Sequence, residues 1–374
     1  MNRLLILIKP VSGNCNLCCR YCFYTDVAQL RKQQNKGAMS LQTLEKMIYN
    51  ALSESTELCV FGFQGGEPTL AGLDFYRECI RLEQKYNKNH VLIRHSLQTN
   101  GILLDDEWCA FLAENKFLTG LSIDGPKFPH DMLRVDRNEK GTHSRSLKAA
   151  RLLVKHKAEF NILTVVTRQL AAHPIKVYQY YKKMNFQYLQ FIPCIERFDE
   201  KDDTSVYSLD SKSYGDFLCC LFDQWYEDYL RGDYCSIRNF DNFIYILAGY
   251  PPENCASSGI CSASPVVEAD GSVYPCDFYA IDSYCLGNIE TLSFTEMLSG
   301  GISDVFVAPS RFRHPKCSAC SYYFICRGGC RREREPAVDG QVGLNKFCAA
   351  YMRFFQHAQP RMAKIAHGLR HTRL

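Results

Sequence analysis

The amino-acid sequence predicts an α/β fold in which a partial (β/α)6 barrel precedes a cysteine-rich domain. Up to about residue 195, short β-rich runs alternate with helical patterns, as they do in parallel β/α units. With 374 residues, the chain is long enough for two domains. Cysteines crowd into 255–348, where the composition changes. We therefore expect the barrel in 1–235 and the cysteine-rich domain, which ends in a helix, in 236–374.

Six runs rich in β-branched, aromatic and other apolar residues are the predicted strands. They comprise residues 4–9, 58–64, 91–98, 119–123, 161–166 and 188–192. Because a closed TIM barrel has eight strands, this TIM-like barrel is predicted to be partial. In such folds the chemistry takes place at the carboxyl ends of the strands. Loops 15–22, 65–67, 99–101 and 124–126 follow these ends, and we expect them to form one shared site.

Apolar residues between the strands recur at the spacing of amphipathic helices. One set is Leu41, Leu44, Met47, Ile48 and Leu52, and another is Leu147, Ala150, Leu153 and Val154. Residues 208–249 are predicted to form a connecting helical region. Its aromatic side, interpreted as core packing rather than as a ligand site, comprises Phe217, Phe222, Trp225 and Tyr229. The basic tail, 361–374, is interpreted as the solvated end of a helix.

Composition and charge exclude several classes of protein. Hydrophobic residues make up 46% and charged residues 22% of the chain, and the net charge of +4 leaves no strong nucleic-acid footprint. No apolar stretch reaches the roughly 18 residues that span a bilayer. The apolar opening run, 4–8, is short and lacks a cleavage site for export. We therefore expect a cytoplasmic protein whose 20 cysteines are metal ligands and buried thiols rather than disulfides.

The loop after the first strand carries a C-x3-C-x2-C run, formed by Cys15, Cys19 and Cys22. Thiolates are the ligands that iron–sulfur clusters select. Three ligands on a four-iron cluster leave one iron open, and a small molecule can be bound and activated there. The alternatives are a zinc knuckle, which the spacing fits poorly, and three buried thiols. Cys18 could compete with Cys19 for ligation.

Eight cysteines in the second part of the chain are further candidate ligands. Eight thiolates suffice for two four-iron clusters without an open iron, and electron transfer is the natural task of such clusters. The last cysteine of a tight run often serves the other cluster. One predicted set is therefore Cys255, Cys261, Cys276 and Cys330, and the other is Cys317, Cys320, Cys326 and Cys348. A pair of structural zinc sites is the alternative.

The remaining nine cysteines lie mostly in apolar or helical contexts. They are Cys18, Cys59, Cys79, Cys109, Cys194, Cys219, Cys220, Cys235 and Cys285. Since a free thiol behaves as a small hydrophobic group, we interpret them as buried packing residues.

These features together resemble the radical S-adenosylmethionine (SAM) enzymes that carry a C-terminal auxiliary-cluster domain called SPASM. The three-cysteine loop with Phe23 and Tyr24, and the GGE sequence at 65–67, match the superfamily's cluster and SAM motifs. Several strings resemble the anaerobic sulfatase-maturating enzymes within it, namely CRYCFY (19–24), FQGGEPTLAG (63–72), LQTNG (97–101), LSIDGP (121–126), YPCDFY (274–279) and GGCRR (328–332). This resemblance covers nearly the whole chain.

The resemblance implies three [4Fe-4S] clusters and SAM as cofactors. The open cluster would be held by Cys15, Cys19 and Cys22, and the family arrangement supports the same division of the other eight ligands. The implied SAM contacts are Tyr21, Gly66, Ser122, Arg134 and Ile195. For Ser122 and Ile195 taken alone, a packing role would be the ordinary interpretation.

The resemblance also implies a reaction. The radical derived from SAM removes a hydrogen atom from Cβ of a cysteine or serine in a sulfatase C/S-x-P/A-x-R segment. Asp277 takes the thiol or hydroxyl proton, and an auxiliary cluster near Cys276 accepts the second electron, so that Cα-formylglycine results. Gln64 and Tyr24 are candidates to hold the target residue. The expected partners are an unfolded or nascent sulfatase and a reductant such as flavodoxin or ferredoxin, and we expect a monomer that binds neither nucleic acid nor membrane.

Two other functions remain open at this stage. One is a SPASM-type maturase that cross-links or cyclises a ribosomal peptide. Such enzymes usually carry an extra peptide-binding domain near the N-terminus, and here the first strand is predicted to begin by Leu4. The other is a non-enzymatic iron–sulfur electron carrier, which would need neither an open cluster nor a GGE loop.

Overall fold

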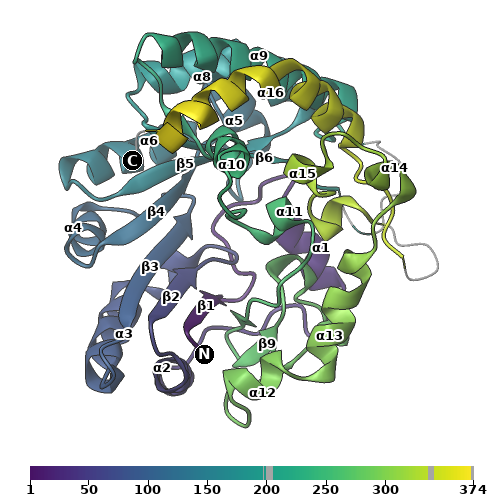
Figure 1. Ribbon diagram of the computed structural model, residues 1–374. Coiled ribbons are helices and arrows are strands. Elements are labelled where there is room, and N and C mark those ends of the chain that lie inside the picture. Colours follow the sequence, from purple (N-terminus) through teal and green to yellow (C-terminus); the bar gives the residue numbers. More distant parts are fainter. Residues whose placement is uncertain (197, 199–204, 336–340, 372–374) are drawn as a thin grey trace. The chain divides into compact units, whose positions relative to one another are not determined.

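The computed structural model describes residues 1–196, 198, 205–335 and 341–371, which form two compact units (Figure 1). Unit 1 contains Met1–Ile123, His130–Phe160 and Ala263–Phe306. Unit 2 contains Asp124–Pro129, Asn161–Ser262 and Val307–Leu374. The boundary at 235/236 remains a prediction from the sequence.

Unit 1 is built on a sheet whose central strands are parallel. β1 (Arg3–Ile8), β2 (Leu58–Phe63), β3 (Leu92–Thr99) and β4 (Phe117–Ser122) lie side by side in chain order. On the other side of β1, β8 (Val266–Val267) pairs in parallel, and β9 (Ser272–Tyr274) and β10 (Gly287–Asn288) continue the sheet in antiparallel orientation. A segment from the second half of the sequence therefore extends the sheet beside the first strand.

Helices and short turns connect and cover the strands of unit 1. They are α1 (Phe23–Gln29), α2 (Leu41–Glu54), η1 (Pro68–Ala71), α3 (Leu73–Tyr86), α4 (Asp106–Glu114), α6 (His143–Lys155), η2 (Asp277–Tyr279), η3 (Asp282–Tyr284) and α12 (Phe294–Leu298), while α5 (Lys127–Leu133) and α13 (Gly301–Val307) contain residues of both units. Ser40 caps α2 by accepting a hydrogen bond from the Thr43 amide. The buried face of α2 includes Leu44, Met47, Ile48 and Leu52, as the spacing predicts, whereas Leu41 of the predicted set is exposed.

Unit 2 combines three parallel strands with long helices. The strands are β5 (Phe160–Val166), β6 (Tyr188–Pro193) and β7 (Ser236–Ile237). The helices and turns are α7 (Arg168–Ala171), α8 (Pro174–Lys183), α9 (Ser211–Leu230), α10 (Arg238–Leu247), α11 (Cys255–Ser258), η4 (Ala308–Arg311), α14 (Pro315–Ser318), α15 (Tyr323–Cys326), η5 (Arg331–Glu333) and α16 (Cys348–His371). Phe354 of α16 packs against Phe222 and Phe240, with ring centroids 5.8 and 5.6 Å away. This aromatic cluster joins α9, α10 and α16 into one core.

The six predicted strands are confirmed, with ends that move by at most two residues. Phe217, Phe222 and Trp225 are fully buried, which confirms their interpretation as core. Val154 was expected on the buried face of its helix, but it is 61% exposed because it falls on the solvent side of α6. Among the described residues, no helix is long and apolar enough to cross a membrane.

The prediction that the basic tail is a helix end is confirmed for its described part, but one face of this helix end is buried rather than solvated. Residues 361–371 continue α16, and Met362, Ile365 and Ala366 are buried. Arg361 forms an ion pair with Asp223 of α9, so even a basic residue of this segment contacts the core helices. The amphipathic pattern of α16 outweighs its charge, because one face buries apolar area while the charges remain at the rim. Residues 372–374 lie outside the described part.

Candidate active site and cluster ligands

The carboxyl ends of β1, β2 and β3 bring three of the predicted loops to the same edge of the sheet in unit 1. The cysteine loop follows β1, residues 65–67 follow β2, and Asn100 follows β3. The amide of Glu67 donates a hydrogen bond of 2.7 Å to the carbonyl of Asn14, which ties two of these loops together. The fourth predicted loop, 124–126, belongs to unit 2.

Cys15 lies where these loops meet. Its Sγ accepts a hydrogen bond from the Leu17 amide at 3.3 Å and from Nδ2 of Asn100 at 3.8 Å. Burial raises the pKa of the Cys15 thiol to about 12, and the nearby Glu67, Cys19 and Cys22 add to the rise. Burial likewise raises the pKa of Cys22. Cys19 and Cys22 therefore lie close enough to Cys15 to interact with it electrostatically.

This donor set fits an iron–sulfur cluster. A thiol with a pKa of about 12 is protonated near neutral pH, so Cys15 becomes a thiolate only when a cation compensates its charge. Cluster iron supplies that charge. The two N–H groups directed at the Cys15 sulfur are suited to stabilise a thiolate.

Gly66 shapes the loop next to the cysteines. Its backbone has φ of +49°, and a Cβ at this position would lie 2.0 Å from the carbonyl oxygen of Asn14. Glu67 is buried and turns away from that contact, because its carboxylate accepts hydrogen bonds from the side chains of Thr69 and Thr99 and from the Asn100 amide. The glycine thus lets the 65–67 loop pack closely against the chain just before Cys15.

Four of the five predicted SAM contacts lie in unit 1. Nη1 of Arg134 donates a hydrogen bond of 2.8 Å to the hydroxyl of Tyr21, which links the residue after α5 to the cysteine loop. Ser122 ends β4, is nearly buried and accepts a hydrogen bond of 3.0 Å from Nε2 of Gln98. Ile195 lies in unit 2, half-buried just after β6.

Asp277 is the centre of a polar group in unit 1. Its Oδ2 accepts hydrogen bonds from the hydroxyl of Tyr24 at 2.6 Å and from Nε2 of Gln64 at 3.1 Å. Gln64 also donates to the Tyr24 hydroxyl at 2.9 Å. Burial, together with the negative charge of Asp277, raises the pKa of Tyr24 well above its usual value, so the phenol is a hydrogen-bond donor. The structure therefore brings together the predicted base and the two residues predicted to hold the target.

The sequence analysis missed three buried charges beside Asp277. Nζ of Lys9 is 2.9 Å from Oδ1 of Asp277, and Glu268 forms ion pairs with both Lys9 and Arg31. One signal was available, since Lys9 and Glu268 each follow an apolar strand run where a charge would be costly unless paired. Their partners could not be found in this way, because they are distant in the sequence.

The auxiliary cysteines divide between the two units. Burial raises the pKa of Cys326 to about 12, with further contributions from Cys348 and Cys317. Burial also raises the pKa of Cys348, and Cys317 and Cys320 add to that rise. These four thiols of the second predicted set are therefore neighbours in unit 2.

The first predicted set is spread over both units. Cys255 and Cys261 are neighbours in unit 2, since the charge of Cys255 adds to the burial that raises the pKa of Cys261. Cys330 also belongs to unit 2, whereas Cys276 belongs to unit 1, directly before Asp277. This ligand set remains a prediction.

Most of the cysteines interpreted as packing residues are buried. These are Cys59, Cys79, Cys109, Cys194, Cys219 and Cys235. The interpretation is wrong for Cys18 and Cys220, which are exposed, and for Cys285, which is half-buried. Cys220 follows a buried cysteine on α9, and the helical turn of about 100° per residue moves it to the solvent side.

Comparison with known protein families gives two matches. The radical SAM superfamily matches residues 10–179, and the SPASM family, described as an iron–sulfur cluster-binding domain, matches residues 260–321. Together these matches cover the three-cysteine loop and part of the second cysteine group. The SPASM match decides between the two readings of that group in favour of iron–sulfur clusters over zinc.

Similar proteins extend over the whole chain. The cysteine-type anaerobic sulfatase-maturating enzyme of Clostridium perfringens is 44% identical over 370 residues, which are 99% of this chain and 100% of that protein. The enzyme of the same name from Clostridium novyi is 42% identical over 99% of both chains. The solved structure of native anSMEcpe with bound AdoMet and Cp18Cys peptide superposes with a TM-score of 0.94 at 44% identity, covering 98% of this chain and 99% of that one.

Proposed function

The chain belongs to the family of anaerobic sulfatase-maturating enzymes, and we propose that it oxidises a cysteine of a sulfatase segment to Cα-formylglycine. It is a radical SAM oxidoreductase with a partial TIM-like barrel, a SPASM domain, [4Fe-4S] clusters and SAM as cofactors. The similar proteins named above are cysteine-type enzymes, which supports cysteine as the target. A serine in the same position is the second candidate target.

One observation carries the proposal. Asp277 receives hydrogen bonds from Tyr24 and Gln64 at the same sheet edge that holds the three-cysteine loop. A carboxylate in this position can accept the proton of a substrate thiol while the radical acts on the adjacent carbon. An electron carrier would have no use for such a base beside an open cluster.

The conversion balances in atoms and electrons. Bound SAM and the clusters supply the radical that takes one Cβ hydrogen atom and the acceptor for the remaining electron. Asp277 takes the thiol proton, so the C–S single bond becomes a thioaldehyde double bond. Water then adds to the thioaldehyde, and sulfur leaves as hydrogen sulfide to give the aldehyde. Tyr24 and Gln64 hold the Asp277 carboxylate, and through it the target side chain, in place.

We assign the ligand roles as follows. Cys15, Cys19 and Cys22 hold the cluster that binds SAM, and the two sets Cys255, Cys261, Cys276, Cys330 and Cys317, Cys320, Cys326, Cys348 hold the auxiliary clusters. The SAM contacts are Tyr21, Gly66, Ser122, Arg134 and Ile195. The proximity of the thiols supports the set of Cys15, Cys19 and Cys22 and the set of Cys317, Cys320, Cys326 and Cys348, while in the remaining set it supports Cys255 and Cys261.

The proposed partner is an unfolded or nascent sulfatase, because a folded one would bury the target residue. We further propose that the enzyme is a cytoplasmic monomer reduced by a flavodoxin or ferredoxin, since a chain with many thiolate sites needs a reducing compartment. The boundary between barrel and SPASM domain is placed at 235/236.

Mass spectrometry of a C-x-P-x-R peptide tests the function. The peptide is incubated anaerobically with the reconstituted enzyme, SAM and a reductant. We expect a loss of about 18 Da from the cysteine peptide, or about 2 Da from its serine twin, as chemical arithmetic for formylglycine. SAM cleavage with no mass change in either peptide would contradict the proposal.

A further inference from the structure

Lys9 directly follows β1 and is almost completely buried, with 2% of its side chain exposed. A buried lysine is rare unless it is paired. None of the roles assigned above uses this side chain, although it lies beside the proposed base.

The ammonium group of Lys9 lies between two carboxylates. Its Nζ is 2.9 Å from Oδ1 of Asp277 and 3.4 Å from Oε1 of Glu268. Glu268 has a nearer partner, since its Oε1 is 2.7 Å from Nη1 of Arg31. Two cations and two carboxylates thus alternate, and the buried set is neutral. Because the charge of Arg31 compensates that of Glu268, the charge of Lys9 compensates that of Asp277, its nearer partner.

The loop after β2 leaves room for the Lys9 side chain. Gly65 has φ of +89°, and a Cβ at this position would lie 2.5 Å from Cγ of Lys9. The methylene stem of Lys9 therefore passes through space that only a glycine leaves open. Nζ also lies 4.6 Å from the centre of the Tyr24 ring, where a cation is attracted to the aromatic face. Lys9 is consequently held from several sides.

We propose that Lys9 is a positioning residue that fixes the orientation of the Asp277 carboxylate for the reaction proposed above, on which this inference rests. Lys9 holds Oδ1, while Tyr24 and Gln64 hold Oδ2. Rotation of the carboxylate about its Cβ–Cγ bond would break the ion pair at Oδ1 and the two hydrogen bonds at Oδ2. Glu268, which is itself paired with Arg31, in turn holds Lys9, so the orientation of Asp277 depends on a chain of buried charges.

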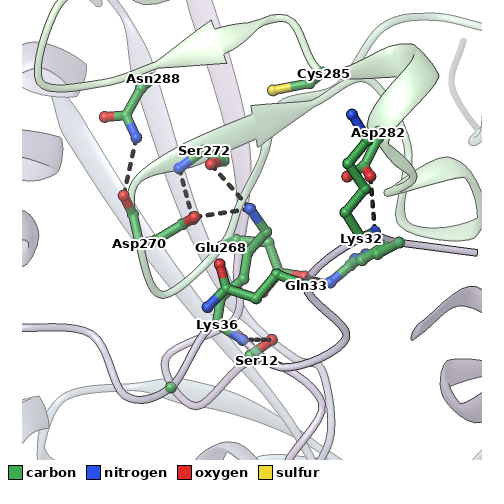
Figure 2. A network of polar contacts seen from close by, with 12 residues as sticks. Ser12, Lys32, Gln33, Lys36, Glu268, Asp270, Ser272, Asp282, Cys285 and Asn288 are labelled. Carbon is green, nitrogen blue, oxygen red and sulfur yellow. Dashed lines mark hydrogen bonds and ion pairs between the residues drawn. The ribbon is translucent and has the colours of Figure 1, made fainter. Parts of the chain in front are cut away.

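A nearby lysine provides a matched control. Lys36 donates hydrogen bonds to Asp270 at 2.7 Å and to Ser272 at 3.2 Å, on the same β8–β9 segment that carries Glu268 (Figure 2). Its partner is thus Asp270 and not Asp277, and Figure 2 shows Asp270 on the turn before β9. Lys36→Met removes a paired charge of this unit without altering the contacts of Asp277.

The test compares wild type, Lys9→Met and Lys36→Met, each reconstituted anaerobically and incubated with SAM, reductant and the C-x-P-x-R peptide. We measure iron content, 5′-deoxyadenosine and formylglycine peptide. For Lys9→Met we expect formylglycine per 5′-deoxyadenosine to fall by at least about tenfold, as misplaced catalytic groups do, with KM for the peptide changed less than about threefold. Lys36→Met should resemble wild type.

Two double variants separate positioning from folding. Lys9→Met/Glu268→Gln restores the charge balance of the buried set, so it should bind iron and SAM like wild type and still lose formylglycine. Lys9→Met/Asp277→Asn should be no worse than Asp277→Asn alone, because Lys9 acts only through Asp277.

The inference is overturned if Lys9→Met keeps the wild-type ratio of formylglycine to 5′-deoxyadenosine. It is overturned equally if the fall in this ratio caused by Lys9→Met adds to the fall caused by Asp277→Asn. It is also overturned if iron, SAM cleavage and product fall together in both Lys9→Met and the charge-balanced double variant, because the role of Lys9 would then be structural. A wild-type enzyme that forms no formylglycine would instead disprove the proposed function, and this inference with it.

Discussion

The hydroxyl of Tyr24 donates a hydrogen bond of 2.6 Å to Oδ2 of Asp277, although 253 positions separate the two residues in the sequence. Tyr24 lies at the start of α1, directly after the three-cysteine loop, and Asp277 follows Cys276 at the start of η2. The parallel pairing of β8 with β1 brings these two segments together. One hydrogen bond therefore connects the residues just after the loop of the proposed SAM cluster with the residue next to Cys276, a proposed auxiliary ligand.

Asp277→Asn should retain SAM cleavage and lose aldehyde formation. Asparagine keeps the size of the side chain and can still accept from Tyr24, but it cannot take the substrate proton. We expect formylglycine to fall by about 100-fold or more, the usual loss for a general base. Parallel measurement of 5′-deoxyadenosine and product checks this. Asp270→Asn is the control, because the Asp270 carboxylate faces Lys36 instead of the proposed site. An unchanged yield of formylglycine from Asp277→Asn would remove Asp277 from the mechanism.

Gly66→Ala should weaken both stability and SAM binding. The new Cβ would meet the Asn14 carbonyl at 2.0 Å in a backbone with positive φ, so the loop must move. The conformational term alone costs about 1–2 kcal/mol. Urea unfolding and SAM titration of the reconstituted enzyme measure the two effects. Gly301→Ala is the control because its Cβ would meet nothing within 4 Å, and equal behaviour of the two variants would contradict the assigned role of Gly66.

Cys326→Ser should remove one auxiliary cluster. Cys326 is half-buried with Cys317 and Cys348 as neighbours, and a serine hydroxyl is a poor substitute for a thiolate on iron. Iron analysis after anaerobic reconstitution should give about four fewer irons per chain, out of about twelve, on the count of four per cluster. Cys220→Ser alters an exposed cysteine of α9 and should keep the full content. Full iron in Cys326→Ser would exclude Cys326 as a ligand.

His130→Gln should make the stability of the protein less sensitive to acid. Burial, with Arg134 and His143 nearby, lowers the pKa of His130 from 6.5 to about 2, so the folded state holds it neutral. Below pH 6.5 the unfolded chain binds a proton that the folded chain does not, and stability is lost as the pH falls. Glutamine can keep the hydrogen bond from Nε2 to the Thr142 hydroxyl without titrating.

The measurement for His130 is a pair of urea unfolding curves for each protein, at pH 7.5 and 5.5 with equal iron content. Between pH 7.5 and 5.5, the free energy of unfolding of the wild type should fall by about 1.4 kcal/mol more than that of the variant. This is the free energy that corresponds to one proton over one pH unit below 6.5. An equal loss in both proteins would mean that His130 does not remain neutral in the fold.

Local sequence patterns were sufficient to predict most of the strands and helices of the fold. The six strands follow from short apolar runs, and α2 follows from the spacing of Leu44, Met47 and Ile48, because the period of a helix or strand is visible within a few turns. Val154 was misplaced because a helical position at the edge of the apolar face can turn either way. β7 and the strands β8 to β10 were missed because two- or three-residue strands carry too little pattern.

The candidate site was predicted in part. The three-cysteine spacing predicted a cluster from thiolate chemistry alone, and the resemblance supplied Asp277, Tyr24 and Gln64. That these three side chains form one hydrogen-bonded group is visible only in the structure. Of the buried cations, Lys9 was marked only by its place after an apolar run, and Arg31 by no sequence signal.

The sequence by itself determined which atoms can bind iron and, to within two residues, where the six longer strands lie, because ligand chemistry and backbone periodicity are properties of neighbouring residues. Only the tertiary structure decided that Lys9 faces Asp277, 2.9 Å away, with Glu268 and Arg31 behind it. Burying either charge alone would be costly, so the two charges must leave water together. The pairing of β8 with β1 brings the two charges together, and this pairing cannot be seen in any local stretch of the sequence.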